Sequence, residues 1–261
     1  MLDWLGLRIG NFEYTRHEFF SSGKATLAPN TNRSWEYPYE SYSMISYNKA
    51  ALWLKTLEGL VGVDVMDEIM QTYFDRWRFR HPCGRDFVAV VNEIVSNRFS
   101  EKWPDGMDWY FTQVLEGTGL CDYAIVSISN DVLKEPTGYL TDTITCVLPD
   151  QQEGEPLQFY SRVVVQRIGE IQVPLDIAIT FDDGHVASEW WDGKDRIREF
   201  MYSGNTKIVS AEIDPERKIY LDFNFINNSM SVRRTDAGSR YYFSKYMTAV
   251  QHFLETISLF M

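Results

Sequence analysis

Apolar side chains recur every three or four residues between residues 46 and 117, which predicts α-helices in this part of the chain. The first predicted helix begins at Ser46, a residue type favoured at helix N-termini, and ends at Gly62. Further helices are predicted over residues 64–77, 85–97 and 107–116. Because the connections between them are short, we expect these helices to pack as antiparallel neighbours.

After residue 123 the pattern changes to alternation and β-branched runs, which predicts strands. We expect strands over residues 124–128, 140–148, 158–167, 173–181, 206–212 and 218–225, with a hairpin turn at Asp183-Gly184. Short strands at this spacing are typical of an antiparallel β-sandwich. Helical spacing returns over residues 241–261.

These elements predict an α+β protein in three parts. Residues 1–120 form an α-helical part, residues 121–232 form a β-sandwich, and residues 233–261 form a C-terminal helix that packs on the body. Residues 1–46 are aromatic, rich in Gly, Ser and Asn and weakly periodic, so loops are expected there, for example at residues 21–23 and 28–32.

The composition is that of a folded protein with an acidic surface. The 261 residues are 44% hydrophobic and 24% charged, and the formal net charge is −12. Nucleic acids and anionic membrane surfaces attract clusters of Lys and Arg, so this charge argues against either as the main partner. No run reaches the roughly 18 apolar residues of a membrane span.

Metal-ligating residues do not form a complete motif in this chain. His17-Glu18 begins like the HExxH signature of zinc peptidases, but Ser21 stands where the second His is required. The cysteines form no CxxC pair, so buried thiols are expected at Cys83, Cys121 and Cys146. The acidic pairs in residues 182–183 and 192–195 fall on predicted turns, where we expect solvated carboxylates. The chain itself is therefore expected to bind no metal.

Tyr47 directly follows the predicted start of the first helix and precedes Lys49. A tyrosine hydroxyl at a helix N-terminus can donate a hydrogen bond to an anionic intermediate, and the helix dipole favours negative charge there. An aromatic ring that simply packs at a helix start would give the same pattern. The spacing alone leaves both interpretations open.

A longer set of motifs follows Tyr47 without a gap. It comprises Tyr47-Asn48-Lys49-Ala50, Leu54, Leu57, Leu60, Gly62, Tyr73-Phe74, the aromatic-basic run 77–82 and Asp86-Phe87. This set resembles peptidase family M1, the gluzincin zinc aminopeptidases, and looser similarity continues at Asp214-Pro215 and over residues 222–229. The resemblance implies that the helices are the C-terminal half of a thermolysin-like catalytic domain, followed by a β-sandwich.

The resemblance also implies catalytic residues that this chain does not contain. In that family, HExxH and a downstream Glu bind zinc and precede the Tyr-x-Lys element, and this chain has no HExxH. We therefore expect residues 1–261 to be the C-terminal part of a longer peptidase that binds zinc and a peptide substrate. Tyr47 matches the tyrosine that donates to the oxyanion, while the chain alone is expected to be inactive. A surface near residues 1–50 exposed by truncation would favour self-association.

Several alternatives remain open at this point. Glu36, Glu40 and Tyr42, with Tyr37 and Tyr39, are candidates for lining a substrate cleft, or they pack a loop. The alternative is a natural short homologue that lost catalysis and acts as a scaffold or a peptide-binding module, and a buried Tyr47 would favour this. A carbohydrate-binding sandwich would need a row of exposed aromatic residues. Residues 190–191 are the only candidate pair, and adjacent strand residues face opposite sides.

Overall fold

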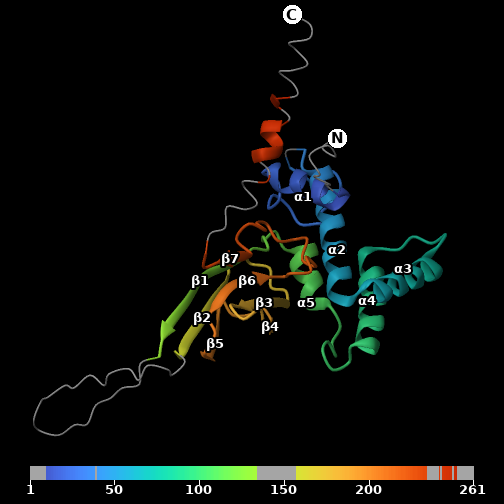
Figure 1. The fold of residues 1–261 in the computed structure, drawn as a ribbon. Helices are drawn as coiled ribbons and strands as arrows, with labels where there is room; N and C mark the ends of the chain where they lie inside the picture. The colour runs from blue at the N-terminus through green and yellow to red at the C-terminus, as the bar shows by residue number, and fades with distance from the viewer. Residues whose placement is uncertain are drawn as a thin grey trace, which may run out of the picture.

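Helices and antiparallel sheets occupy opposite sides of the molecule in the computed structural model, which describes residues 10–38, 40–133, 157–233, 241, 243–248 and 250–251 (Figure 1). The predicted α+β class is confirmed. The helices are α1 (Asn11–Ser21), α2 (Ala50–Val61), α3 (Val63–Trp77), α4 (Gly84–Arg98) and α5 (Asp108–Phe111). There are two π-helical segments. The first, η2 (Met44–Lys49), continues into α2, and the second, η3 (Thr112–Glu116), follows α5.

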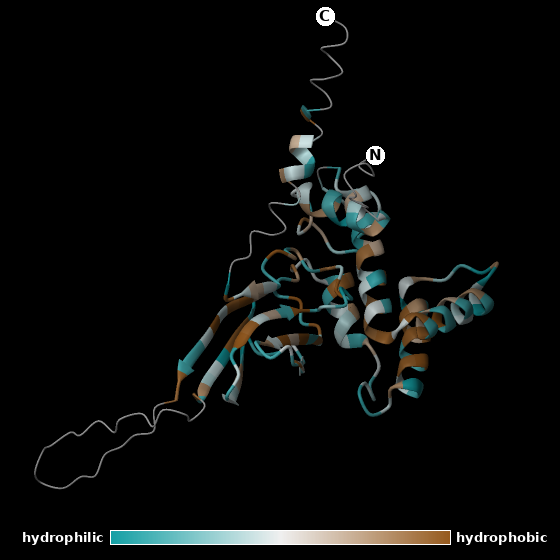
Figure 2. Cartoon of the chain, viewed as in Figure 1, coloured by the Kyte–Doolittle hydropathy of each residue, from teal (hydrophilic) through white to brown (hydrophobic). Residues whose placement is uncertain are grey.

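The apolar stripe of α2 forms the centre of the helical part. Leu52 and Leu57 are completely buried and pack with Ile69 of α3 and Val91 of α4. Figure 2 shows apolar residues along α2 and α4. The helix that leads into α2 begins earlier than predicted, because the backbone nitrogen of Ile45 already donates to the Ser41 carbonyl. Ser46 is therefore not an N-cap and lies inside the π-helical segment.

Helix α1 was not predicted, because its apolar residues form no continuous stripe and only Phe19 is fully buried. The loop predicted over residues 21–23 is confirmed at residues 22–23, where Gly23 adopts a φ of 67°, but Ser21 is still the last residue of the helix. Helix α1 contacts the sheet side of the molecule. The Arg16 Nε donates to the Asp222 carbonyl at 2.9 Å, and the rings of Phe20 and Phe223 meet edge to face at 5.2 Å.

Helices α3 and α4 form an antiparallel pair that projects away from the sheets (Figure 1). Ion pairs join Arg76, near the end of α3, to Glu93 within α4, and Arg98, at the end of α4, to Glu68 within α3. The expected antiparallel packing of α2 against α3 is wrong. Gly62 is the one residue between them, with a φ of 91°, and a single residue cannot reverse the chain direction, so α3 leaves α2 at a steep angle.

The described strands form two antiparallel sheets. One contains β1 (Tyr123–Val132), β2 (Phe159–Arg167) and β5 (Ile197–Gly204) in the order β1-β2-β5. The other has the order β4-β3-β6-β7, with β3 (Leu175–Phe181), β4 (Val186–Trp191), β6 (Ile208–Ile213) and β7 (Ser229–Ser231). Strand β1 also contacts β6 and β7, so the inner faces share one core. The β3–β4 hairpin turns at Asp183-Gly184 as predicted, and its carboxylates are exposed.

The strand predicted over residues 218–225 is wrong, since the structure has turns there. The Asp214 carboxylate accepts hydrogen bonds from the backbone nitrogens of Lys218 and Ile219. The Asp222 and Asn224 side chains accept from backbone nitrogens two residues further on. Such local side-chain bonds give the backbone an alternative to strand pairing. The strand expected over residues 140–148 lies outside the described residues.

Three smaller expectations have mixed outcomes. Trp190 is exposed and Trp191 is buried, as alternation predicts, so this pair forms no aromatic row. Cys121 is buried as expected, Cys83 is exposed at the N-cap of α4, and Cys146 lies outside the described residues. Residues 243–248 are helical, but Phe243, Tyr246 and Met247 are exposed, so docking of this helix on the body stays a prediction.

The backbone of Gly59 in α2 lies very close to the 214–219 turn. A Cβ atom placed at Gly59 would lie 2.5 Å from the Lys218 carbonyl oxygen and 2.9 Å from its Cα. We expect Gly59→Ala to lower the free energy of unfolding by about 1–3 kcal/mol, although alanine usually stabilises a helix interior. Gly84→Ala is the matched control, because a Cβ there meets nothing within 4 Å. Equal urea midpoints for both variants would contradict this packing.

Candidate functional site

Tyr47 lies in η2 with its side chain directed to solvent. The side chain is 63% exposed. Its ring meets the ring of Tyr42 edge to face at 5.9 Å, and Tyr42 meets Tyr37 in the same way at 5.6 Å. The structure thus places Tyr47 beside the cleft candidate Tyr42, both exposed, with the half-buried Tyr37 next to Tyr42.

Hydrogen bonds from three directions hold the helical segment that carries Tyr47. The Asn30 amide donates to the Ile45 carbonyl at 2.6 Å, and the Asn48 amide donates to the Glu18 carboxylate of α1 at 3.3 Å. The Lys49 ammonium donates to the Gly117 carbonyl at 2.9 Å, just after η3. Because the neighbours of Tyr47 are fixed, its hydroxyl is carried by a held backbone rather than by a free loop.

Lys49 is an unusual member of this network because it is almost completely buried, with an exposed fraction of 2%. Among the described residues it forms no ion pair. Burial penalises the charged amine and lowers the pKa of Lys49 from 10.5 to about 8. Lys49, the lysine of the Tyr-x-Lys element, is therefore an amine whose burial lowers the stability of the fold.

Tyr42 is affected electrostatically by its neighbour. Hydrogen bonding to the Tyr47 hydroxyl, together with charge repulsion from that group, raises the pKa of Tyr42 above its ordinary value. The helix-dipole argument for Tyr47 is weaker than expected, because the helix begins before residue 46 and Tyr47 is not at its N-terminus.

The two acidic cleft candidates lie on the exposed loop before η2. The Glu36 carboxylate accepts a hydrogen bond from the Arg33 backbone nitrogen at 3.0 Å, so it closes a local turn. Glu40 is exposed, has a φ of 54°, and accepts from Lys24 through its backbone carbonyl. These contacts fit the loop-packing alternative, and they do not direct either carboxylate to Tyr47. Tyr39 lies outside the described residues.

Potential metal ligands remain apart in the folded chain. Within residues 10–38, 40–133 and 157–233 and the short C-terminal stretches, no group of three His, Cys, Asp or Glu side chains is placed to hold a metal ion. His17 lies on α1, His81 follows α3, and His185 lies beside the β3–β4 turn. The described residues thus do not fit a zinc site.

Sequence reasoning missed a buried polar cluster next to α1. Desolvation raises the pKa of Asp222 from 3.8 to about 6, against the opposing hydrogen bond from the Asn228 amide at 2.9 Å. The Arg16 guanidinium lies 3.7 Å from the centroid of Phe225. Asp222 and Asn224 fix this loop, because their side chains accept hydrogen bonds from backbone nitrogens two residues further on.

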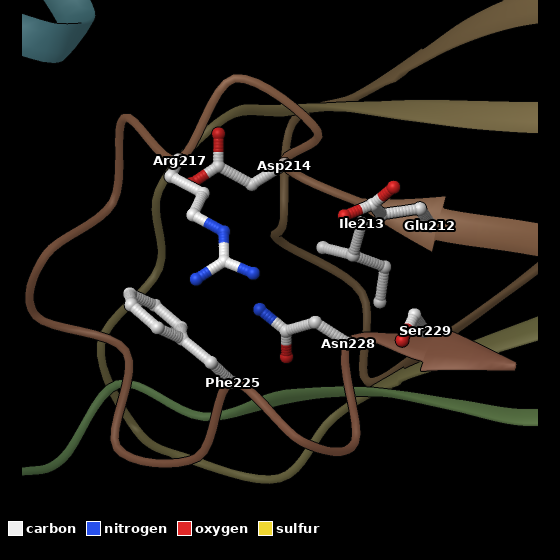
Figure 3. A pocket seen from close by; sticks show the side chains of 7 residues that line it. All are labelled: Glu212, Ile213, Asp214, Arg217, Phe225, Asn228 and Ser229. Carbon is white, nitrogen blue, oxygen red and sulfur yellow. The ribbon is translucent and has the colours of Figure 1, made fainter. Parts of the chain in front are cut away.

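A small pocket opens beside this cluster (Figure 3). It has a volume of about 30 Å³, which suits one or two water molecules. The Arg217 side chain points into it between Asp214, Phe225 and Asn228. Glu212 and Ser229 complete the polar lining. Because charges of both signs meet in so small a space, the pocket does not select an anionic or a cationic ligand.

No model of a known protein family matches this chain, and no curated protein matches it. In the part of the chain that the structure describes, no helix combines the length and hydropathy needed to cross a bilayer.

The buried Lys49 predicts a pH dependence of stability. Its pKa is about 8 in the folded chain and near 10.5 when unfolded, so between these values the unfolded chain binds more protons. The free energy of unfolding should therefore rise between pH 8 and 10.5, by about 3 kcal/mol from this residue. We expect Lys49→Met to remove this rise, measured as the difference between the urea unfolding curves of wild type and variant. Parallel pH profiles for the two proteins would show that Lys49 is not buried as a cation.

Proposed function

We propose that this chain is the C-terminal part of an M1-type zinc aminopeptidase, in which Tyr47 donates a hydrogen bond to the oxyanion formed at an N-terminal peptide bond. The resemblance of residues 42–99 to that family supports the assignment. The single observation that carries it is the exposed position of Tyr47 on a held helix. The thermolysin-like arrangement of the helices is part of the same proposal.

The physical role of Tyr47 follows from its position. An exposed hydroxyl can meet a substrate carbonyl oxygen, and a donor already held in place needs no reorganisation as charge develops. Tyr42 packs its ring against that of Tyr47 and restricts the directions it can take. A Tyr47 buried beneath its own chain would have favoured a scaffold or binding module instead.

Among the described residues, no three metal-ligating side chains come together. The proposal assigns the zinc ligands and the general base to a segment encoded ahead of this chain. When bound there, zinc would polarise the scissile carbonyl. The contribution proposed for this chain is the hydroxyl donor, together with the fold that holds it.

The chain alone is expected to hydrolyse no peptide bond, because it lacks HExxH. The measurement is release of the leaving group from aminoacyl amides by the purified 261-residue chain, with and without added zinc. Turnover that rises with protein concentration and survives repeated purification would contradict the proposed division of labour.

In the protein translated from the whole reading frame, Tyr47→Phe should lower kcat about 10²–10³-fold while KM stays near its wild-type value, because the lost bond is made mainly in the transition state. Tyr160→Phe is the control, since that exposed tyrosine lies on β2 and, within the described residues, its hydroxyl bonds to the Met201 sulfur. A Tyr47→Phe enzyme with wild-type kcat would remove Tyr47 from the site.

A further inference from the structure

The turn between α3 and α4 presents an aromatic ring at its apex. Phe79 is completely exposed, at 101%. Its φ of 62° lies in the left-handed region, which is strained for a bulky side chain. The exposed residues Arg78 and Arg80 flank it. Among the described residues neither guanidinium takes part in an ion pair. We call residues 78–80 the tip.

The charge of this region is opposite to that of the rest of the protein. Residues 74–85 contain four arginines and one aspartate, a formal charge of +3. The remainder of the chain has 21 basic and 36 acidic residues, a formal charge of −15. At moderate salt the tip is therefore attracted to the acidic surface of another copy.

A cleft of suitable size opens at one end of the two sheets. It has a volume of about 150 Å³ and is bounded by the β3–β4 hairpin on one side and the end of β5 on the other. The Phe181 ring meets the Tyr202 ring edge to face at 5.2 Å and stacks on the His185 ring at 5.8 Å. Ala187 and Thr206 also line it. An apolar space of about this volume accepts a benzene-sized ring.

Acidic groups surround the cleft. Asp182 and Asp183 are exposed on the β3–β4 turn, directly after Phe181. Glu189 accepts a hydrogen bond from the Tyr202 hydroxyl at 2.6 Å. In the described part of the chain none of these three carboxylates forms an ion pair. His185 lines the cleft, and Lys207 lies nearby with its ammonium over the Phe159 ring at 4.4 Å.

We propose that the tip of one copy of this chain binds the cleft of a second copy, with the Phe79 ring inside and Arg78 and Arg80 beside Asp182 and Asp183. The cleft has the size of one aromatic ring, an aromatic lining and acidic surroundings, and the tip supplies an aromatic ring flanked by two arginines. Because tip and cleft are different surfaces, the contact is head-to-tail. A contact this small gives weak, salt-sensitive association. The proposal does not depend on peptidase function.

Sedimentation equilibrium of the 261-residue chain tests the contact. The weight-average mass should rise above that of a monomer as concentration increases, and the rise should shrink at high salt. Phe79→Ala should weaken association at least tenfold. Arg78→Glu with Arg80→Glu should do the same, and all of these residues are exposed, so folding is preserved. Ile226→Ala is the control, because Ile226 is 88% exposed and lies outside both the tip and the cleft.

Mixing two variants separates a head-to-tail contact from other modes. Ala187→Phe fills the cleft but leaves the tip intact, whereas Phe79→Ala removes the tip ring and leaves the cleft intact. Each variant alone should be monomeric, and their mixture should form a one-to-one dimer. Ser188→Phe, on the opposite face of β4, is the control for the added ring.

Three results would overturn the proposal. They are a wild-type chain that stays monomeric, an Ala187→Phe variant that associates as well as wild type while Phe79→Ala does not, and a mixture that yields no dimer although both variants are folded by circular dichroism. The second result would indicate contact between tips. None of these results bears on the role of Tyr47.

Discussion

The buried hydrogen bond from Lys49 to the Gly117 carbonyl is the constraint on which the rest of the site depends. Lys49 follows Tyr47 by two residues, and Gly117 ends η3, where the chain leaves the helices for the first strand. The helix that carries the exposed tyrosine is thus tied to the junction between the two parts of the fold. Burying the Lys49 amine lowers the stability of the folded chain. Its presence therefore fits a role in positioning the helix that carries Tyr47.

A second junction, on the other side of η2, has the same character. Arg16 of α1 bonds to the backbone at Asp222, a buried carboxylate whose pKa is raised to about 6 by desolvation. Helix α1 in turn receives the Asn48 amide through Glu18. The segment that carries Tyr47 is therefore hydrogen-bonded to η3 through Lys49 and to α1 through Asn48, and α1 is in turn bonded to the sheet side of the molecule.

The sequence was informative where periodicity decides structure and uninformative where single hydrogen bonds do. The stripe 52–57 and the alternation in 159–167 and 175–181 specify α2, β2 and β3, because burial of one face dominates there. Residues 218–225 have the composition of a strand, yet Asp214, Asp222 and Asn224 hold them in turns. The exposure of Tyr47 and the burial of Lys49 depend on tertiary contacts separated by up to 68 residues, which no local pattern encodes.

The central claim is that the Tyr47 hydroxyl meets the oxygen that becomes negative during peptide hydrolysis. A crystal structure of the protein from the whole reading frame, bound to a phosphinic peptide, measures this most directly, since a phosphinyl oxygen stands in for the oxyanion. The account predicts that Tyr47 donates to that oxygen at about 2.7–3.1 Å. A phosphinyl group bound with Tyr47 beyond hydrogen-bonding distance, or facing another surface of the protein, would contradict it.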